Sequence, residues 1–215
     1  MEDCRCGHLG SIFTPRMAAR EAKRYREHGP GRASALLIGE ILERGVDNAV
    51  VLDIGGGVGA IQHELLAGGA QRTVSVDAAP SYRDELVEEA ARRGHEARVL
   101  TFDGDFVELA ASIEAADIVT LDKVICCDPD AETLLEAAAG HATQLVGLVY
   151  PRETLLVRAG ARMLNTGLWL FRRRFRWLVH PVARVDAVLA EAGFRPSFRR
   201  RGLRTMPWEI ALYER

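Results

Sequence analysis

Short apolar runs alternate along the chain with longer segments in which apolar residues recur every three or four positions. The runs have the length of buried strands, and the spacing in the longer segments is typical of amphipathic helices. We therefore expect strands at 50–54, 71–77, 98–102, 117–122 and 144–150, with helices at 61–67, 81–93, 106–115 and 131–141. This alternation predicts an α/β fold built on a parallel sheet.

Further segments extend this unit at both ends. Two helices precede it and form a helical cap within residues 1–45, at 15–27 and 33–44. An inserted, largely helical stretch follows it within residues 151–180, and we expect it to face a substrate. The chain then closes with a helix and two strands, at 181–192, 194–200 and 208–214.

Composition narrows the class of protein. At 215 residues the chain suits one domain, 1–215, with a substantial core, and its net charge of −2 argues against a general nucleic-acid binder. It contains no apolar run that could cross a bilayer and its first residues do not form a signal peptide, so we expect a cytoplasmic protein. Cys4, Cys6 and His8 do not have the spacing of a strong zinc motif, so no metal site is predicted.

The strand at 50–54 runs into a glycine cluster, which is the strongest chemical signal in the sequence. Gly55, Gly57 and Gly59 let the backbone turn sharply and approach a ligand, whereas the N–H groups of the next helix face it. This pattern indicates a nucleotide-type cofactor loop. Gly55, Gly57 and Ala60 also fit the dinucleotide fingerprint, so an NAD(P)-dependent oxidoreductase is one alternative.

Asp53 precedes the first glycine by two residues, giving D-x-G-x-G-x-G. This motif resembles the first motif of class I S-adenosylmethionine (SAM)-dependent methyltransferases, and the resemblance covers nearly the whole chain. It implies a Rossmann-like, seven-stranded, mostly parallel sheet with an antiparallel last strand, and SAM as the cofactor. A SAM-binding protein without catalysis is the other alternative.

The resemblance also assigns cofactor contacts. Asp53 and the glycines would surround the methionine part of SAM, Asp77 the ribose, and Asp103 or Asp105 the adenine amino group. Tyr25 would be an aromatic residue near SAM, although helix packing explains it equally well. The complete predicted set is Tyr25, Asp53, Gly55, Gly57, Gly59, Asp77, Ala78, Asp103, Gly104, Asp105 and Asp122.

Within the superfamily, the insertion and the strings around residues 150–152 and 180–181 look most similar to magnesium-protoporphyrin O-methyltransferases and quinone-biosynthesis methyltransferases. Such enzymes methylate a carboxylate or a phenol on a bulky apolar molecule. A carboxylate would need a cationic anchor, for which Arg152 is the candidate, and a phenol would need a base, for which His180 is the candidate. The predicted substrate-binding residues are Lys123, Cys126, Tyr150, Arg152 and His180.

Two segments bear on the partner. Residues 122–130 lack the N-P-P-Y or D-P-P-Y pattern that holds a flipped base, so we expect a small-molecule acceptor and no nucleic acid. Residues 155–177 combine many apolar side chains with arginines. That stretch could line a pocket for an apolar acidic substrate, lie on an anionic membrane, or cover the sheet with a solvated arginine face.

Overall fold

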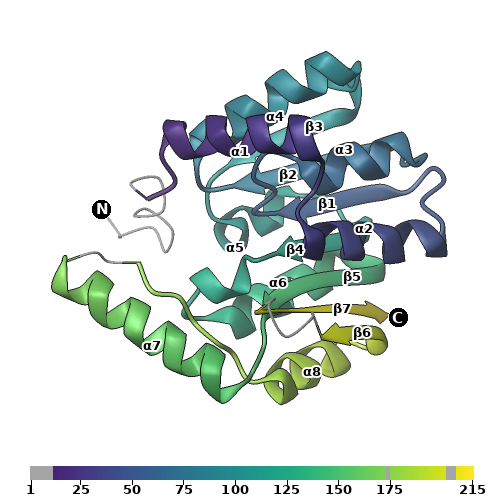
Figure 1. Cartoon of the computed structure of the whole chain (residues 1–215). Helices are drawn as coiled ribbons and strands as arrows, with labels where there is room; N and C mark the ends of the chain where they lie inside the picture. Colours follow the sequence, from purple (N-terminus) through teal and green to yellow (C-terminus); the bar gives the residue numbers. More distant parts are fainter. Residues whose placement is uncertain (1–11, 173–174, 202–206) are drawn as a thin grey trace.

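A computed structural model describes residues 12–172, 175–201 and 207–215 of the chain. Its centre is one seven-stranded sheet with the order β3-β2-β1-β4-β5-β7-β6 (Figure 1). The strands are β1 (Val50–Ile54), β2 (Arg72–Asp77), β3 (Val99–Asp103), β4 (Ala116–Asp122), β5 (Ala142–Pro151), β6 (Arg195–Arg201) and β7 (Trp208–Glu214).

Neighbouring strands from β3 to β5 pair in parallel, and β7 pairs antiparallel with both β5 and β6. This arrangement confirms the predicted Rossmann-like sheet with an antiparallel last strand. The chain winds outward from β1 to β3 and then returns to place β4 on the other side of β1. In open α/β sheets, such a reversal leaves a crevice beyond the carboxyl ends of the strands.

Helices cover both faces of the sheet (Figure 1). The apolar cores place α5, α6 and α8 on one face and α2 and α3 on the other, whereas α1 packs along α4. Strand β1 serves both faces: Leu52 and Ile54 contact the first core, and Val51 contacts the second. The helices are α1 (Pro15–His28), α2 (Arg32–Arg44), α3 (Ala60–Ala67), α4 (Pro80–Arg93), α5 (Phe106–Leu109), α6 (Ala131–His141), α7 (Leu155–Leu170) and α8 (Val182–Glu191).

Two predicted helices are shorter in the structure than in the sequence analysis. The one expected at 106–115 ends as α5 at Leu109, followed by a 3₁₀ turn over Ala110–Ser112, because Ile113 adopts an extended conformation and is buried. Within the described residues of the insertion, α7 is the one helix, and residues 175–180 have no regular secondary structure.

Helix α7 differs from the other long helices in its packing. All of its residues are described, and only Ala161 among them is buried. Within the described ranges, no helix has both the length and the apolar content needed to span a membrane.

Candidate active site

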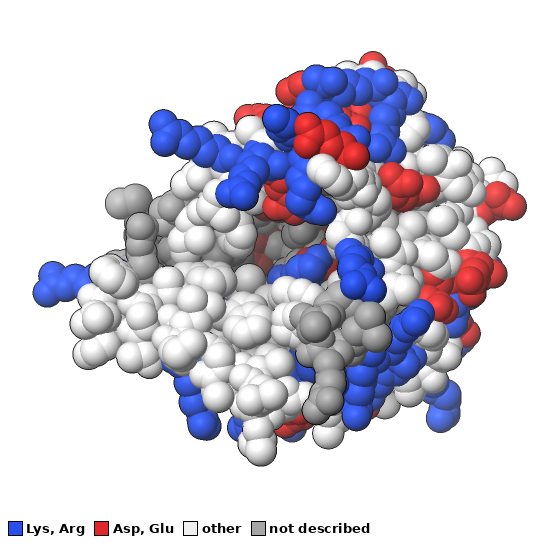
Figure 2. All heavy atoms as spheres, in the orientation of Figure 1, with Lys and Arg blue, Asp and Glu red and all other residues white. Residues whose placement is uncertain are grey.

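A cavity of about 430 Å³ lies at the carboxyl ends of β1, β2 and β4, where the strand order reverses. Its size is within the range of small-molecule sites. Figure 2 shows that this face of the molecule is hollowed near its centre, with acidic and basic side chains inside the hollow. Residues lining it include Phe13, Glu21, Ser34, Asp53, Gly55, Gly57, Asp77, Ala78, Tyr82, Gly104, Asp105, Phe106, Asp122, Lys123, Cys127 and Asp128.

Gly55, Gly56 and Gly57 form the floor of the cavity beside β1, whereas Gly59, also predicted to contact the cofactor, is not among the described lining residues. Gly55, Gly57 and Gly59 have φ values of +65°, +57° and +77°, which residues with a Cβ rarely adopt. A Cβ on Gly55 would lie 2.6 Å from Val124 Cγ2, and one on Gly56 would lie 2.4 Å from Gln62 Nε2. The turn therefore requires glycine for both conformation and space, and it presents bare backbone to the cavity.

Asp53 lies at the end of β1, just before this turn. The side chain is 1% exposed, accepting hydrogen bonds from Thr120 Oγ1 at 2.6 Å and from Gln62 Nε2 at 3.2 Å. Burial raises the pKa of Asp53 to about 7, although the two hydrogen bonds oppose the shift. Asp53 thus lies at the predicted place and fixes the end of β1 through contacts with α3 and β4.

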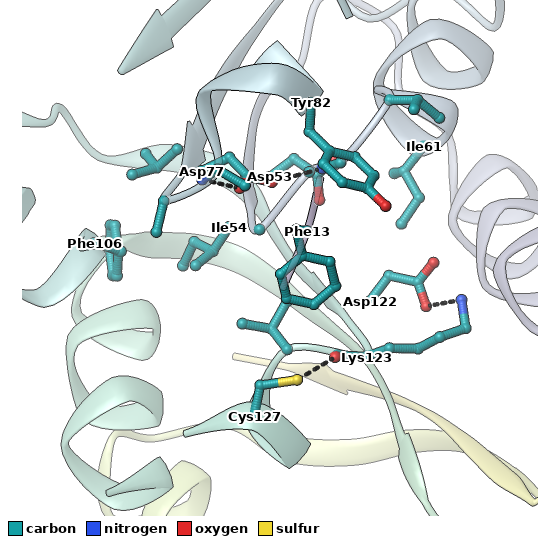
Figure 3. A pocket seen from close by; sticks show the side chains of 18 of the residues that line it. Phe13, Asp53, Ile54, Ile61, Asp77, Tyr82, Phe106, Asp122, Lys123 and Cys127 are labelled. Carbon is teal, nitrogen blue, oxygen red and sulfur yellow. Dashed lines mark hydrogen bonds and ion pairs between the residues drawn. The ribbon is translucent and has the colours of Figure 1, made fainter. Parts of the chain in front are cut away.

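Asp77 projects from the end of β2 toward the same turn (Figure 3). Its Oδ2 accepts from the Gly57 N–H at 3.0 Å, and its Oδ1 accepts from the Ala79 N–H at 2.8 Å. Burial raises the pKa of Asp77, and these two backbone donors counteract the rise. The carboxylate is therefore fixed in orientation at the cavity wall, as a bidentate acceptor for a diol must be.

The two candidates for the adenine contact lie in different environments. Asp103 ends β3 but is exposed and forms an ion pair with Arg83, and it is not among the described residues that line the cavity. Asp105 lines the cavity, is 3% exposed, and caps α5 by accepting from the Val107 N–H at 2.8 Å. The geometry thus favours Asp105 over Asp103.

Tyr25 is buried away from the described cavity wall. Its hydroxyl donates to Glu64 Oε1 at 2.7 Å, and the Arg93 guanidinium lies 4.9 Å from its ring centre. The aromatic residues described at the wall are Phe13, Tyr82 and Phe106, and the rings of Phe13 and Tyr82 meet edge-on at 5.8 Å (Figure 3). The structure thus assigns helix packing to Tyr25.

A polar cluster forms the opposite end of the cavity. Ser34 Oγ donates to Asp122 Oδ2 at 2.5 Å, and Lys123 Nζ lies 2.7 Å from Asp122 Oδ1 and 3.0 Å from Ser34 Oγ. Lys123 has a φ of +65°, an uncommon conformation for a residue with a side chain. Two segments distant in sequence thus meet at this end, where one cation and one carboxylate lie side by side (Figure 3).

Several predicted substrate-binding residues are not among the described residues that line the cavity. Tyr150 is 1% exposed with its hydroxyl 3.2 Å from Glu209 Oε1, and Cys126 is 2% exposed with its thiol 3.1 Å from the Lys123 carbonyl oxygen. Arg152 and His180 are half-buried, and neither is among the described lining residues. Cys4, Cys6 and His8 lie outside the described residues.

The lining also includes residues that were not predicted from the sequence, among them Ser34, Phe13 and Tyr82. Ser34 gave the clearest signal, since it is a polar residue on the apolar face of α2 beside Ala33, Leu37, Ile38 and Ile41. Phe13 precedes the cap residue Thr14, where an apolar side chain often fixes the entry of a helix.

Neither a family model nor a curated protein sequence matches the chain. Several solved structures, however, share the architecture of this chain. Magnesium protoporphyrin IX methyltransferase from Synechocystis PCC 6803, crystallised with S-adenosylhomocysteine, superposes with a TM-score of 0.71 at 18% identity, covering 96% of this chain and 98% of that one.

Two further solved structures superpose on the chain. An O-methyltransferase family protein from Burkholderia thailandensis has a TM-score of 0.72 at 19% identity, covering 98% of this chain and 63% of that one. An O-methyltransferase family 2 protein from Planctomyces limnophilus, in complex with apigenin, has a TM-score of 0.61 at 16% identity, covering 89% and 64%. The chain therefore has the fold of the class I SAM-dependent methyltransferases.

Proposed function

We propose that the protein is a SAM-dependent methyltransferase that acts on an oxygen of a bulky apolar small molecule. The observation that carries the proposal is Asp77, whose carboxylate is locked by two backbone N–H groups at the wall of a cavity floored by left-handed glycines. A ribose diol needs such an acceptor, and an amino-acid moiety can approach such a floor closely.

The residues present fit the cofactor part by part. Gly55, Gly56 and Gly57 line the cavity with backbone alone, and a Cβ at Gly55 or Gly56 would collide with Val124 or Gln62, so this backbone would hold the methionine moiety. Asp77 would bind the ribose hydroxyls, and Asp105 the adenine amino group. When bound, SAM supplies the activated methyl group, so the protein needs no covalent intermediate.

Lys123 is our candidate for orienting the acceptor. It contributes an ammonium group to the cavity wall, which a carboxylate or phenolate oxygen would contact, and Asp122 and Ser34 hold that group in place. Orientation of the oxygen along the methyl–sulfur bond and removal of water would supply most of the acceleration. Arg152 and His180 are not among the described lining residues, so they are weaker candidates for anchor and base.

The cofactor assignment is tested by calorimetry with S-adenosylhomocysteine. We expect the wild type to bind and Asp77→Ala to bind roughly 10- to 100-fold more weakly, because charge-assisted hydrogen bonds are lost. Asp84→Ala is the matched control, since Asp84 is an exposed carboxylate on α4 outside the cavity wall. Binding of NADH in place of S-adenosylhomocysteine would indicate a dehydrogenase instead.

The acceptor is tested by transfer of a radiolabelled methyl group from SAM. The probes are magnesium protoporphyrin IX, a polyprenylated phenol and a fractionated cell extract. We expect Lys123→Met to lose at least roughly tenfold in turnover, since an ion pair with the acceptor is removed, whereas Arg152→Met retains turnover. The reverse result would restore Arg152 as the anchor. Transfer of the label to RNA in the extract would overturn the small-molecule acceptor. Binding of S-adenosylhomocysteine without any methyl transfer would indicate a non-catalytic protein.

A further inference from the structure

Helix α7 presents large apolar side chains to solvent. Leu155 and Leu156 are each 86% exposed, Met163 and Phe171 77%, and Leu170 70%. A soluble protein rarely leaves such residues next to one another on a surface without a partner. Figure 2 shows a broad uncharged surface at the lower left, where Figure 1 places α7.

The exposed residues share one side of the helix. Positions 155, 159, 163, 166 and 170 recur at three- or four-residue spacing and are all exposed. The opposite side, which carries Val157, Ala161 and Leu168, packs on the protein. Apolar residues therefore lie on both sides of the helix, and most of the larger ones point outward.

Charge on this segment has a single sign. Residues 155–180 contain six arginines and no aspartate or glutamate, although the whole chain has a net charge of −2. On α7 itself, Arg158 and Arg162 border the apolar side, and Arg158 is 50% exposed even with Glu153 3.6 Å away. An apolar strip bordered by arginines complements a surface that is apolar inside and negatively charged outside.

The helix is fastened to the wall of the cavity. Asn165 accepts from the Trp177 N–H and donates to the Trp177 carbonyl oxygen, both at 2.8 Å, and the Leu178 N–H donates to the Cys126 carbonyl oxygen at 2.8 Å. The Phe175 ring lies 6.4 Å from that of Phe13, which lines the cavity. A surface bound by α7 would thus lie beside the cavity rather than on a remote part of the molecule.

We propose that the outer face of α7 docks on the surface of an anionic lipid bilayer, with its apolar side chains at the boundary between headgroups and acyl chains. A second copy of the chain is a poorer occupant, because it would bring the same set of arginines against this one. Resting on the proposed function, this placement would let an apolar acceptor dissolved in lipid enter the cavity.

Vesicle co-sedimentation tests the docking with the full chain. We expect binding to phosphatidylglycerol–phosphatidylcholine vesicles at least roughly tenfold tighter than to phosphatidylcholine alone, and weaker when NaCl rises from about 50 to about 500 mM. Leu156→Glu/Met163→Glu should abolish binding. Val87→Glu is the matched control, because Val87 is a 48%-exposed apolar residue on α4, and it should bind as the wild type does.

A second readout locates the contact. Trp169 is 67% exposed, so its emission should shift to shorter wavelength on vesicles, and this shift should be absent in Trp169→Phe while sedimentation persists. Equal binding of the double Glu variant and the wild type, or no vesicle binding at all, would overturn the proposal. The proposal would also be overturned if light scattering without lipid showed a dimer for the wild type and a monomer for Leu156→Glu/Met163→Glu. Calorimetry with S-adenosylhomocysteine is independent of these measurements, so failure of docking and failure of the methyltransferase proposal are distinguishable.

Discussion

At the scale of single residues, the glycine turn depends on space as much as on backbone conformation. Gly55 and Gly94 have nearly the same φ, +65° and +67°, but a Cβ at Gly55 would meet Val124 at 2.6 Å and one at Gly94 would meet nothing within 4 Å. We expect Gly94→Ala to lower the free energy of unfolding by about 1 kcal/mol through conformation alone.

Gly55→Ala should lower the free energy of unfolding by the same amount as Gly94→Ala and by about 1–3 kcal/mol more, because the added methyl overpacks the site. It should also weaken S-adenosylhomocysteine binding. Urea unfolding and calorimetry on both variants give the comparison. Equal losses of stability in the two variants would show that the contact with Val124 is unimportant.

His63 predicts a pH-dependent stability. Its side chain is fully buried, neither ring nitrogen has a hydrogen-bond partner in the described part of the chain, and burial lowers its pKa to about 4. Between about pH 6.5 and 4 the unfolded chain binds this proton and the folded chain does not, so acidification should remove about 3 kcal/mol of stability.

The measurement is the difference in unfolding free energy between wild type and His63→Gln from pH 7 to 4. Asp53, whose pKa is raised to about 7, acts with the opposite sign but is present in both proteins and therefore cancels. His28→Gln, at an exposed histidine, is the control. A constant difference across this range would contradict the expectation.

At the scale of elements, Asn165 holds part of residues 175–180, which have no regular secondary structure. The side chain makes two hydrogen bonds of 2.8 Å with the backbone of Trp177. We expect Asn165→Ala to increase the hydrogen-exchange rate of the Trp177 amide by roughly tenfold or more, since each bond contributes about 1 kcal/mol. Thr166→Ala removes only a bond within the helix, to the Arg162 carbonyl oxygen, and should leave that amide protected.

At the scale of the whole molecule, the cavity joins segments that are far apart in sequence. Phe13, Ser34, Gly55, Asp77 and Lys123 all line it. Ligand binding should therefore stabilise cap and sheet together, by about 2.7 kcal/mol when S-adenosylhomocysteine is at 100 times its dissociation constant. When the ligand is added, the denaturation midpoints measured by circular dichroism and by tryptophan fluorescence should shift together, as a single transition. A cap that unfolds separately at an unchanged midpoint would contradict this expectation.

Most of the fold could be predicted because its signals are local. The apolar run at 50–54, the glycines after it and the alternation of strands and helices are each readable within a few residues. The end of α5 could not be predicted, because the conformation of the segment after Leu109 depends on the burial of Ile113 against elements distant in sequence. Lys123 could be predicted, but its pairing with Ser34 could not, since the two are 89 positions apart.

The sequence by itself determined the class of the sheet, the glycine turn and the positions of Asp53 and Asp77, because strand ends and turn geometry follow from short-range spacing and sterics. Tertiary structure decided between Asp103 and Asp105, moved Tyr25 into a helix interface, and placed Lys123 rather than Arg152 at the described wall. It also left the larger apolar side chains of α7 exposed. These choices depend on which neighbours surround a side chain, and packing alone sets those neighbours.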